Sequence, residues 1–167
     1  MGFTVSLEAD HGQSCPHWFT GSDSKALVQH LAVSYAWGAS DGPNVLAWLE
    51  PRLGVSFEML ARIGSEEVSL EEIVEMGGSE DDWRKDQERN RRSWQPVEDF
   101  TGGLEELLRR IEAKPEVFEQ IEEELELDAG DIDYFEKGVF TSDLRDLLEM
   151  ARWAKETGAA RVRITTG

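Results

Sequence analysis

The sequence has one cysteine, no basic leader and no long apolar run, and each absence excludes a class of protein. With Cys15 alone, an intramolecular disulfide is excluded and a reducing, cytoplasmic location is predicted. The first ten residues, MGFTVSLEAD, hold neither a basic stretch nor an apolar core, so we expect no secretory signal. No window approaches the roughly 18 apolar residues of a membrane-spanning helix, so we expect no membrane association.

Positive charge is also scarce. Lys and Arg number 17 against 35 Asp and Glu, which gives a formal net charge of −18 and an isoelectric point near 4.4. An electrostatic field of this sign repels nucleic acid and attracts cationic partners, so we predict a basic protein partner and no nucleic acid. The alternative is that the charge serves only solubility.

Alternation of apolar and polar residues predicts a strand at each end of the chain, over 3–9 and 160–166. We expect these strands to pair, a third strand within 55–70, and helices over the apolar face of the sheet. The length of 167 residues and the hydrophobic fraction of 40% fit a single globular domain over 1–167. The predicted fold class is α+β and mostly helical.

Helical signals dominate between the two strands. The clearest amphipathic helix carries Leu104, Leu107, Leu108 and Ile111 at i, i+3, i+4 and i+7. Other helices are predicted over 23–38, after a Ser69–Glu72 capping box, from Pro115 with Phe118, Ile121 and Leu125 inward, and over 142–157.

Proline and glycine predict where the chain is interrupted. Pro43 is expected to open a short helix through Leu49, and Pro51 to stop it. The pairs Gly77-Gly78 and Gly102-Gly103 are the predicted hinges.

The segment HGQSCPHW, residues 11–18, holds the only cysteine and two of the three histidines. A proline forces the residue before it into an extended conformation, in which side chains two apart point the same way. Cys15 and His17 are therefore a candidate nucleophile and base, with His11 as the alternative base.

The same segment has two other interpretations. His11, Cys15, His17 and the downstream His30 are ligand types that zinc accepts, but their spacing matches no standard zinc motif, so we predict no metal and no cofactor. The interpretation that we favour is a loop between strand and helix, broken by Gly12 and Pro16 and held to the core by Trp18 and Phe19.

Acidic side chains concentrate in residues 104–136, which hold 13 Asp and Glu against 3 Lys and Arg, a local net charge of −10. We expect them on the outer face of two helices, either as a solvated surface or as a site that binds a basic protein. The aspartates of this stretch do not follow the residue order that defines a calcium-binding loop, so we do not expect calcium. The candidate binding residues are Glu119, Glu122, Glu123, Glu126, Asp128, Asp131 and Asp133.

The segment 79–95 differs from the rest because it concentrates arginine and two tryptophans. In a helix, Trp83 and Trp94 are about three turns apart and share a face. Trp and Arg are the side chains that most often anchor interfaces, so both tryptophans are candidate binding residues. The alternative is that they anchor this segment to the core.

These features together predict a small acidic cytoplasmic protein-binding module, an inhibitor or immunity-type neutraliser of a basic partner. The alternative is a cysteine-dependent enzyme using Cys15 with His17 or His11. The sequence leaves the oligomeric state open.

Overall fold

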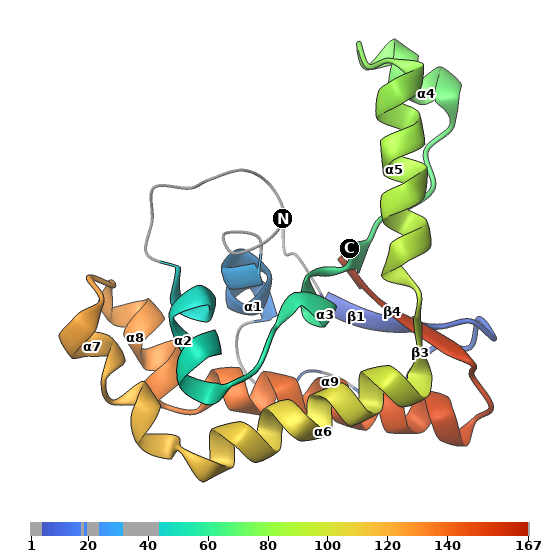
Figure 1. Cartoon of the computed structure of the whole chain (residues 1–167). Coiled ribbons are helices and arrows are strands. Elements are labelled where there is room, and N and C mark those ends of the chain that lie inside the picture. Colours follow the sequence, from blue (N-terminus) through green and yellow to red (C-terminus); the bar gives the residue numbers. More distant parts are fainter. Residues whose placement is uncertain (1–4, 18, 20–23, 32–43, 167) are drawn as a thin grey trace.

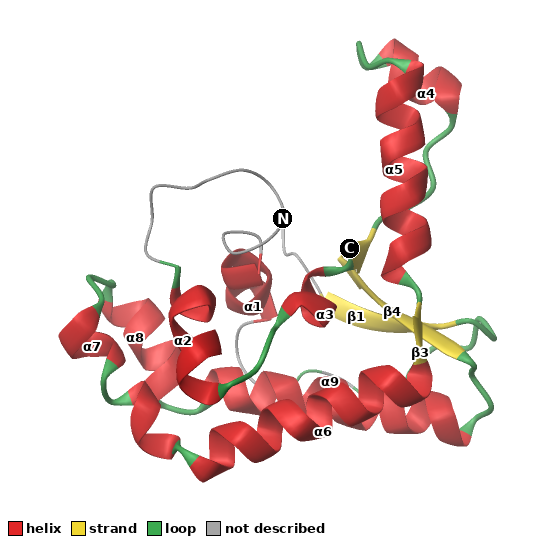
Figure 2. Ribbon diagram, viewed as in Figure 1, coloured by secondary structure: helices red, strands yellow, loops and turns green. Residues whose placement is uncertain are grey.

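A computed structural model of the chain describes residues 5–17, 19, 24–31 and 44–166 (Figure 1). In chain order the elements are β1 (Val5–Ala9), α1 (Ser24–Leu31), α2 (Val45–Leu53), α3 (Glu58–Ala61), β2 (Ile63–Gly64), α4 (Leu70–Glu75), α5 (Glu80–Ser93), β3 (Gln95–Pro96), α6 (Val97–Ala113), the 3-10 helix η2 (Pro115–Phe118), α7 (Ile121–Glu124), α8 (Ala129–Glu136), α9 (Val139–Glu156) and β4 (Arg161–Thr166). Helix far exceeds strand, so the predicted α+β class is confirmed (Figure 2).

The sheet is built around the C-terminal strand. β1 pairs antiparallel with β4 from Val5 opposite Thr166 to Ala9 opposite Val162, as predicted for the two ends of the chain. β2, inside the range predicted for a third strand, pairs parallel with β4, and β3 pairs antiparallel with its beginning. The Asp10 carboxylate accepts hydrogen bonds from the Ala160 and Arg161 backbone N–H groups at 3.0 and 3.2 Å, which ties the two main strands together.

Two long helices cover the sheet. α6 packs along α9 with the opposite chain direction, and both lie below the strands (Figure 1). The predicted stripe of Leu104, Leu107, Leu108 and Ile111 is buried, and α9 buries Leu144, Leu147, Leu148 and Ala151 as predicted. The strands contribute Val5, Leu7, Ala9, Val162 and Ile164 to the same apolar cluster. Helix α9 begins at Val139, three residues before the predicted start.

The prediction that Gly102-Gly103 is a hinge is wrong. Both glycines lie inside α6, which runs without interruption to Ala113. A Cβ at Gly103 would overlap the Sδ atom of Met59, so this glycine permits a close approach between α6 and α3. The other pair ends α4, where Gly77 has φ of +88°.

The prediction that Pro51 stops its helix is also wrong. α2 continues through Pro51 to Leu53 and ends where Gly54 adopts φ of +66° and donates to the Glu50 carbonyl at 2.8 Å. Pro51 has no N–H to donate to the Ala47 carbonyl, but it lies in the last turn, so only one hydrogen bond of the helix is lost. The helix is capped by Asn44, whose side chain accepts from the Ala47 N–H at 3.0 Å.

Other predictions hold in part. Within the predicted helix over 23–38, α1 covers Ser24–Leu31, and the remainder lies outside the described residues, as do Pro43 and Trp18. The helix expected from Pro115 is two short pieces, η2 and α7, although Phe118 and Ile121 are buried as predicted.

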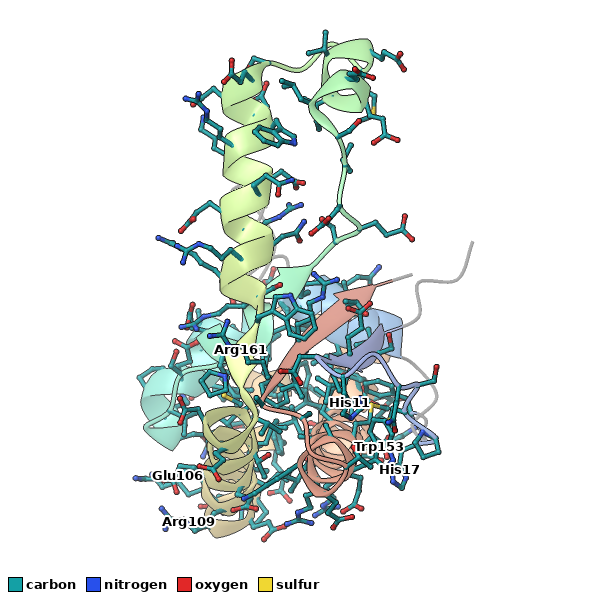
Figure 3. The ribbon with its side chains drawn as sticks, turned by 90° about the vertical axis from the view of Figure 1, so that its right-hand side faces the viewer. His11, His17, Glu106, Arg109, Trp153 and Arg161 are labelled. Carbon is teal, nitrogen blue, oxygen red and sulfur yellow. The ribbon has the colours of Figure 1, made fainter. Side chains whose placement is uncertain are left out.

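Residues 65–93, which we call the arm, rise away from the sheet. The arm consists of an ascending limb, the short helix α4 and the long helix α5, and it projects from the body in both views (Figures 1 and 3). Its base joins β2 on one side and β3 on the other.

Candidate functional site

The acidic surface is formed by η2, α7 and α8, residues 115–136. These 22 residues contain ten Asp and Glu and no Lys, Arg or His. Apolar side chains fix the segment to the core, since Phe118, Ile121, Tyr134 and Phe135 are buried. The carboxylates therefore occupy the outer side, as the sequence predicted.

Three of the ten carboxylates are partnered with cationic or titratable side chains. Glu124 accepts from Trp48 Nε1 at 2.9 Å and from Arg52 at 2.8 Å, which ties α7 to α2. Asp133 pairs with Lys137 at 2.9 Å, and Asp131 lies 3.3 Å from His30. Among the described residues, the other seven have no ion-pair partner; they are Glu116, Glu119, Glu122, Glu123, Glu126, Asp128 and Glu136.

The acidic residues of α6 that belong to the 104–136 region are neutralised within or between helices. On α6, Glu106 pairs with Arg109 (both are labelled in Figure 3) and with Arg110, and Glu105 lies 3.5 Å from Arg152 on α9. The pairing with the two arginines lowers the pKa of Glu106. The uncompensated negative charge of the 104–136 region therefore concentrates in 115–136, away from α6.

Asp128 and Asp131 have local structural roles as well as charge. The Asp128 side chain caps α8 by accepting from the Asp131 N–H at 2.9 Å. Asp131 lies beside the buried His30, whose ring stacks on Tyr134 with centroids 5.7 Å apart and meets Phe135 edge-on at 4.9 Å. Burial lowers the pKa of His30, and the carboxylates of Asp131 and Asp128 oppose that shift.

His11 is held by two hydrogen bonds in the loop after β1. Its Nδ1 accepts from the Gln13 backbone N–H at 3.1 Å, so Nε2 carries the proton and donates to Thr157 Oγ1 at 2.8 Å. The ring also meets Trp153 edge-on with centroids 5.4 Å apart, as Figure 3 illustrates. Both ring nitrogens of His11 are therefore engaged with groups other than Cys15.

Cys15 is half-buried against the apolar core, whereas His17 is exposed at the outer surface. Burial raises the pKa of the Cys15 thiol, and the hydrogen bond from the His17 backbone N–H opposes this only in part. A reactive cysteine needs a lowered pKa, so this environment favours the loop interpretation over the nucleophile. The catalytic roles predicted for Cys15, His17 and His11 stay predictions.

Trp83 and Trp94 line one open hollow of about 530 Å³ beside α5. Trp83 belongs to the helix, but Trp94 follows it in an extended conformation and lies under the Arg163 guanidinium, 4.8 Å from the ring centroid. Both indoles are half-buried against their own chain. Each of the five basic residues of α5 pairs with an acid of the same helix. The helix holds five acids and five bases, so it has no net charge.

The sequence did not single out the exposed apolar residues of the arm. Among the described residues, the exposed large hydrophobic side chains are Leu70, Val74 and Met76, with exposed fractions of 36, 56 and 71%. The sequence shows the capping box at Ser69 and the apolar residues that follow it. Whether another element covers those residues depends on tertiary packing, which the sequence does not show.

Within the described residues, no group of three or more His, Cys, Asp or Glu is arranged to hold a metal ion. No helix there is long and apolar enough to cross a membrane. Comparison with protein-family models, with curated proteins and with solved structures finds no match to this chain.

Proposed function

We propose that this chain is a cytoplasmic protein-binding module that recognises a basic protein through the acidic surface of residues 115–136. The observation that carries the proposal is the concentration of seven acidic side chains on a segment that has no Lys, Arg or His; none of the seven has an ion-pair partner within the part of the chain that the structure describes. The single cysteine supports a reducing compartment.

Uncompensated carboxylates on a fixed surface favour recognition over solubility alone. Buried Phe118, Ile121 and Phe135 hold the segment against the core, so the carboxylates are presented without a large ordering cost on binding. A negative surface speeds the encounter with a positive one and disfavours acidic competitors. An inhibitor or immunity-type neutraliser that covers a basic site requires these properties.

The experiment is affinity capture from the source cell with three forms of the full chain. The acidic-surface variant combines Glu119→Gln, Glu122→Gln, Glu123→Gln and Glu126→Gln. The control variant changes the net charge by the same amount on α6 and α9, where the substituted residues are exposed; it combines Glu98→Gln, Glu105→Gln, Glu149→Gln and Glu156→Gln. Circular dichroism verifies that all three forms fold alike.

We expect one basic protein to be captured by the wild type and the control, to be lost with the acidic-surface variant, and to elute with increasing salt. Capture that ignores both salt and the four substitutions would refute the electrostatic proposal. So would recovery of an acidic partner or of nucleic acid as the main ligand.

A further inference from the structure

The end of the arm presents apolar side chains to solvent in an otherwise strongly charged molecule. Val74 and Met76 are 56 and 71% exposed. Leu70, one turn before Val74 on the same face of α4, is 36% exposed, and Met76 follows at the end of the helix. The arm carries α4 at its far end, away from the acidic surface of α7 and α8 (Figure 1). Exposed apolar groups that cluster on a projecting element are typical of interaction surfaces.

The conformation of this tip is fixed by local hydrogen bonds. Ser69 and Glu72 form a capping box at the start of α4, and Ser79 and Asp82 form a second at the start of α5. Gly78 closes the turn so tightly that an added Cβ would lie 2.6 Å from Ile73 Cγ2. Ile73 is half-buried, whereas Val74 and Met76 are exposed.

Charge limits what can cover the tip. Residues 65–79 hold five Glu and no Lys, Arg or His, whereas the five acids and five bases of α5 balance. Glu72 is used in the capping box, but Glu71 and Glu75 are exposed beside the apolar residues. A second copy of this chain would bring the same negative rim, so like charges oppose self-association through this tip.

We propose that the tip of the arm, residues 66–76, is a docking surface for a protein whose apolar socket is bordered by Lys or Arg. Leu70 and Val74, one turn apart on α4, enter the socket, Met76 contacts its edge from the end of the helix, and Glu71 and Glu75 meet its basic rim. Met suits such a contact because its unbranched side chain adapts to the shape of the socket. This surface is separate from residues 115–136, so either proposal can fail without the other.

The test uses a synthetic amphipathic helical peptide made only of Leu and Lys, with a Leu and Glu peptide of the same pattern as its control. Binding to the full chain is measured by fluorescence anisotropy and mapped by amide and methionine-methyl chemical shifts. Two tip variants are compared, Val74→Ser with Met76→Ser and Glu71→Gln with Glu75→Gln. The matched control is Glu122→Gln with Glu123→Gln, which removes the same charge from α7.

We expect shifts concentrated on residues 66–76, a loss of affinity of at least fivefold in both tip variants, and less than twofold in the control. The Leu and Glu peptide should not bind. Shifts confined to residues 115–136, or equal affinity for wild type and tip variants, would overturn the proposal. Sedimentation that detects a wild-type dimer abolished by Val74→Ser with Met76→Ser would overturn it in favour of self-association.

Discussion

The indole Nε1 of Trp83 donates a hydrogen bond of 3.1 Å to the Val68 carbonyl oxygen, which joins α5 to the limb that leads into α4. Because both residues belong to the arm, this bond connects its two limbs and helps to hold the tip in one conformation. At the base of the arm, the Ser65 N–H donates to Asn90 Oδ1 at 2.8 Å and forms a second tie between the same segments.

Trp83→Phe should loosen the arm without unfolding the protein. The substitution keeps an aromatic ring but removes a hydrogen bond whose net contribution is about 0.5–1.5 kcal/mol. We expect amide exchange in residues 68–78 to accelerate by roughly fivefold, with little change in α6 and α9. Hydrogen exchange followed by mass spectrometry measures this, and uniform acceleration across the chain would contradict a local role.

Gly102→Ala and Gly103→Ala should have different effects on stability. A Cβ at Gly102 meets open space, so alanine there should stabilise α6 by about 0.5–1 kcal/mol. At Gly103 the added methyl group overlaps Met59, which has to move, so the gain should be lost or reversed. Urea unfolding of the two variants compares them directly. Equal stabilisation would mean that α3 and α6 are not closely packed.

His30 should make the fold less stable in mild acid. Burial lowers its pKa in the folded state, so the unfolded chain takes up a proton first as the pH falls below about 6.5. Its contribution to stability is therefore present above that pH and declines as the pH approaches the lowered pKa. Among the described residues, the charged and titratable groups facing the ring are Asp131, Asp128 and Tyr134, and the two carboxylates oppose the shift.

Two variants test this behaviour by urea unfolding at about pH 7.5 and about pH 5.5. His30→Phe keeps the ring contacts and should lose less stability on acidification than the wild type. Asp131→Asn removes the carboxylate that raises the pKa of His30, so it should lose more. Identical pH dependence in all three forms would refute the assignment.

The Cys15 thiol should react slowly. Burial raises its pKa, so the thiolate fraction near neutral pH is smaller than that of an ordinary thiol. Alkylation by iodoacetamide at about pH 7.5 should be slower than that of free glutathione. The opposite result would be alkylation of Cys15 that is faster than that of glutathione in the wild type and slower in His17→Ala. That result would support the cysteine-enzyme interpretation, with His17 as the base.

Local periodicity was sufficient to predict most of the regular elements. The alternation in the terminal strands and the stripe of α6 depend only on which side of each element is apolar, and the structure confirms both. Pro51 was misjudged because it lies in the last turn of α2, where a proline costs one hydrogen bond and Gly54, three residues later, ends the helix. Gly103 was misjudged because its effect depends on tertiary surroundings: it lies against a side chain from a distant helix.

Charges were easier to predict than their partners. Composition located the acidic stretch, but it could not tell that Glu124 is bound by Trp48 and Arg52, more than 70 residues earlier in the chain. The tip of the arm was missed for the same reason, since the apolar residues of a six-residue helix are the same in sequence whether another element covers them or leaves them exposed.

The most direct test of the acidic surface is the rate at which the captured partner associates with the three forms of the chain as ionic strength rises. From about 50 to 500 mM salt, the rate constant for the wild type and for the control variant should fall at least about tenfold. The acidic-surface variant should start slower and depend far less on salt, because its steering charge is reduced. The same salt dependence in all three forms would contradict the claim that residues 115–136 receive the partner.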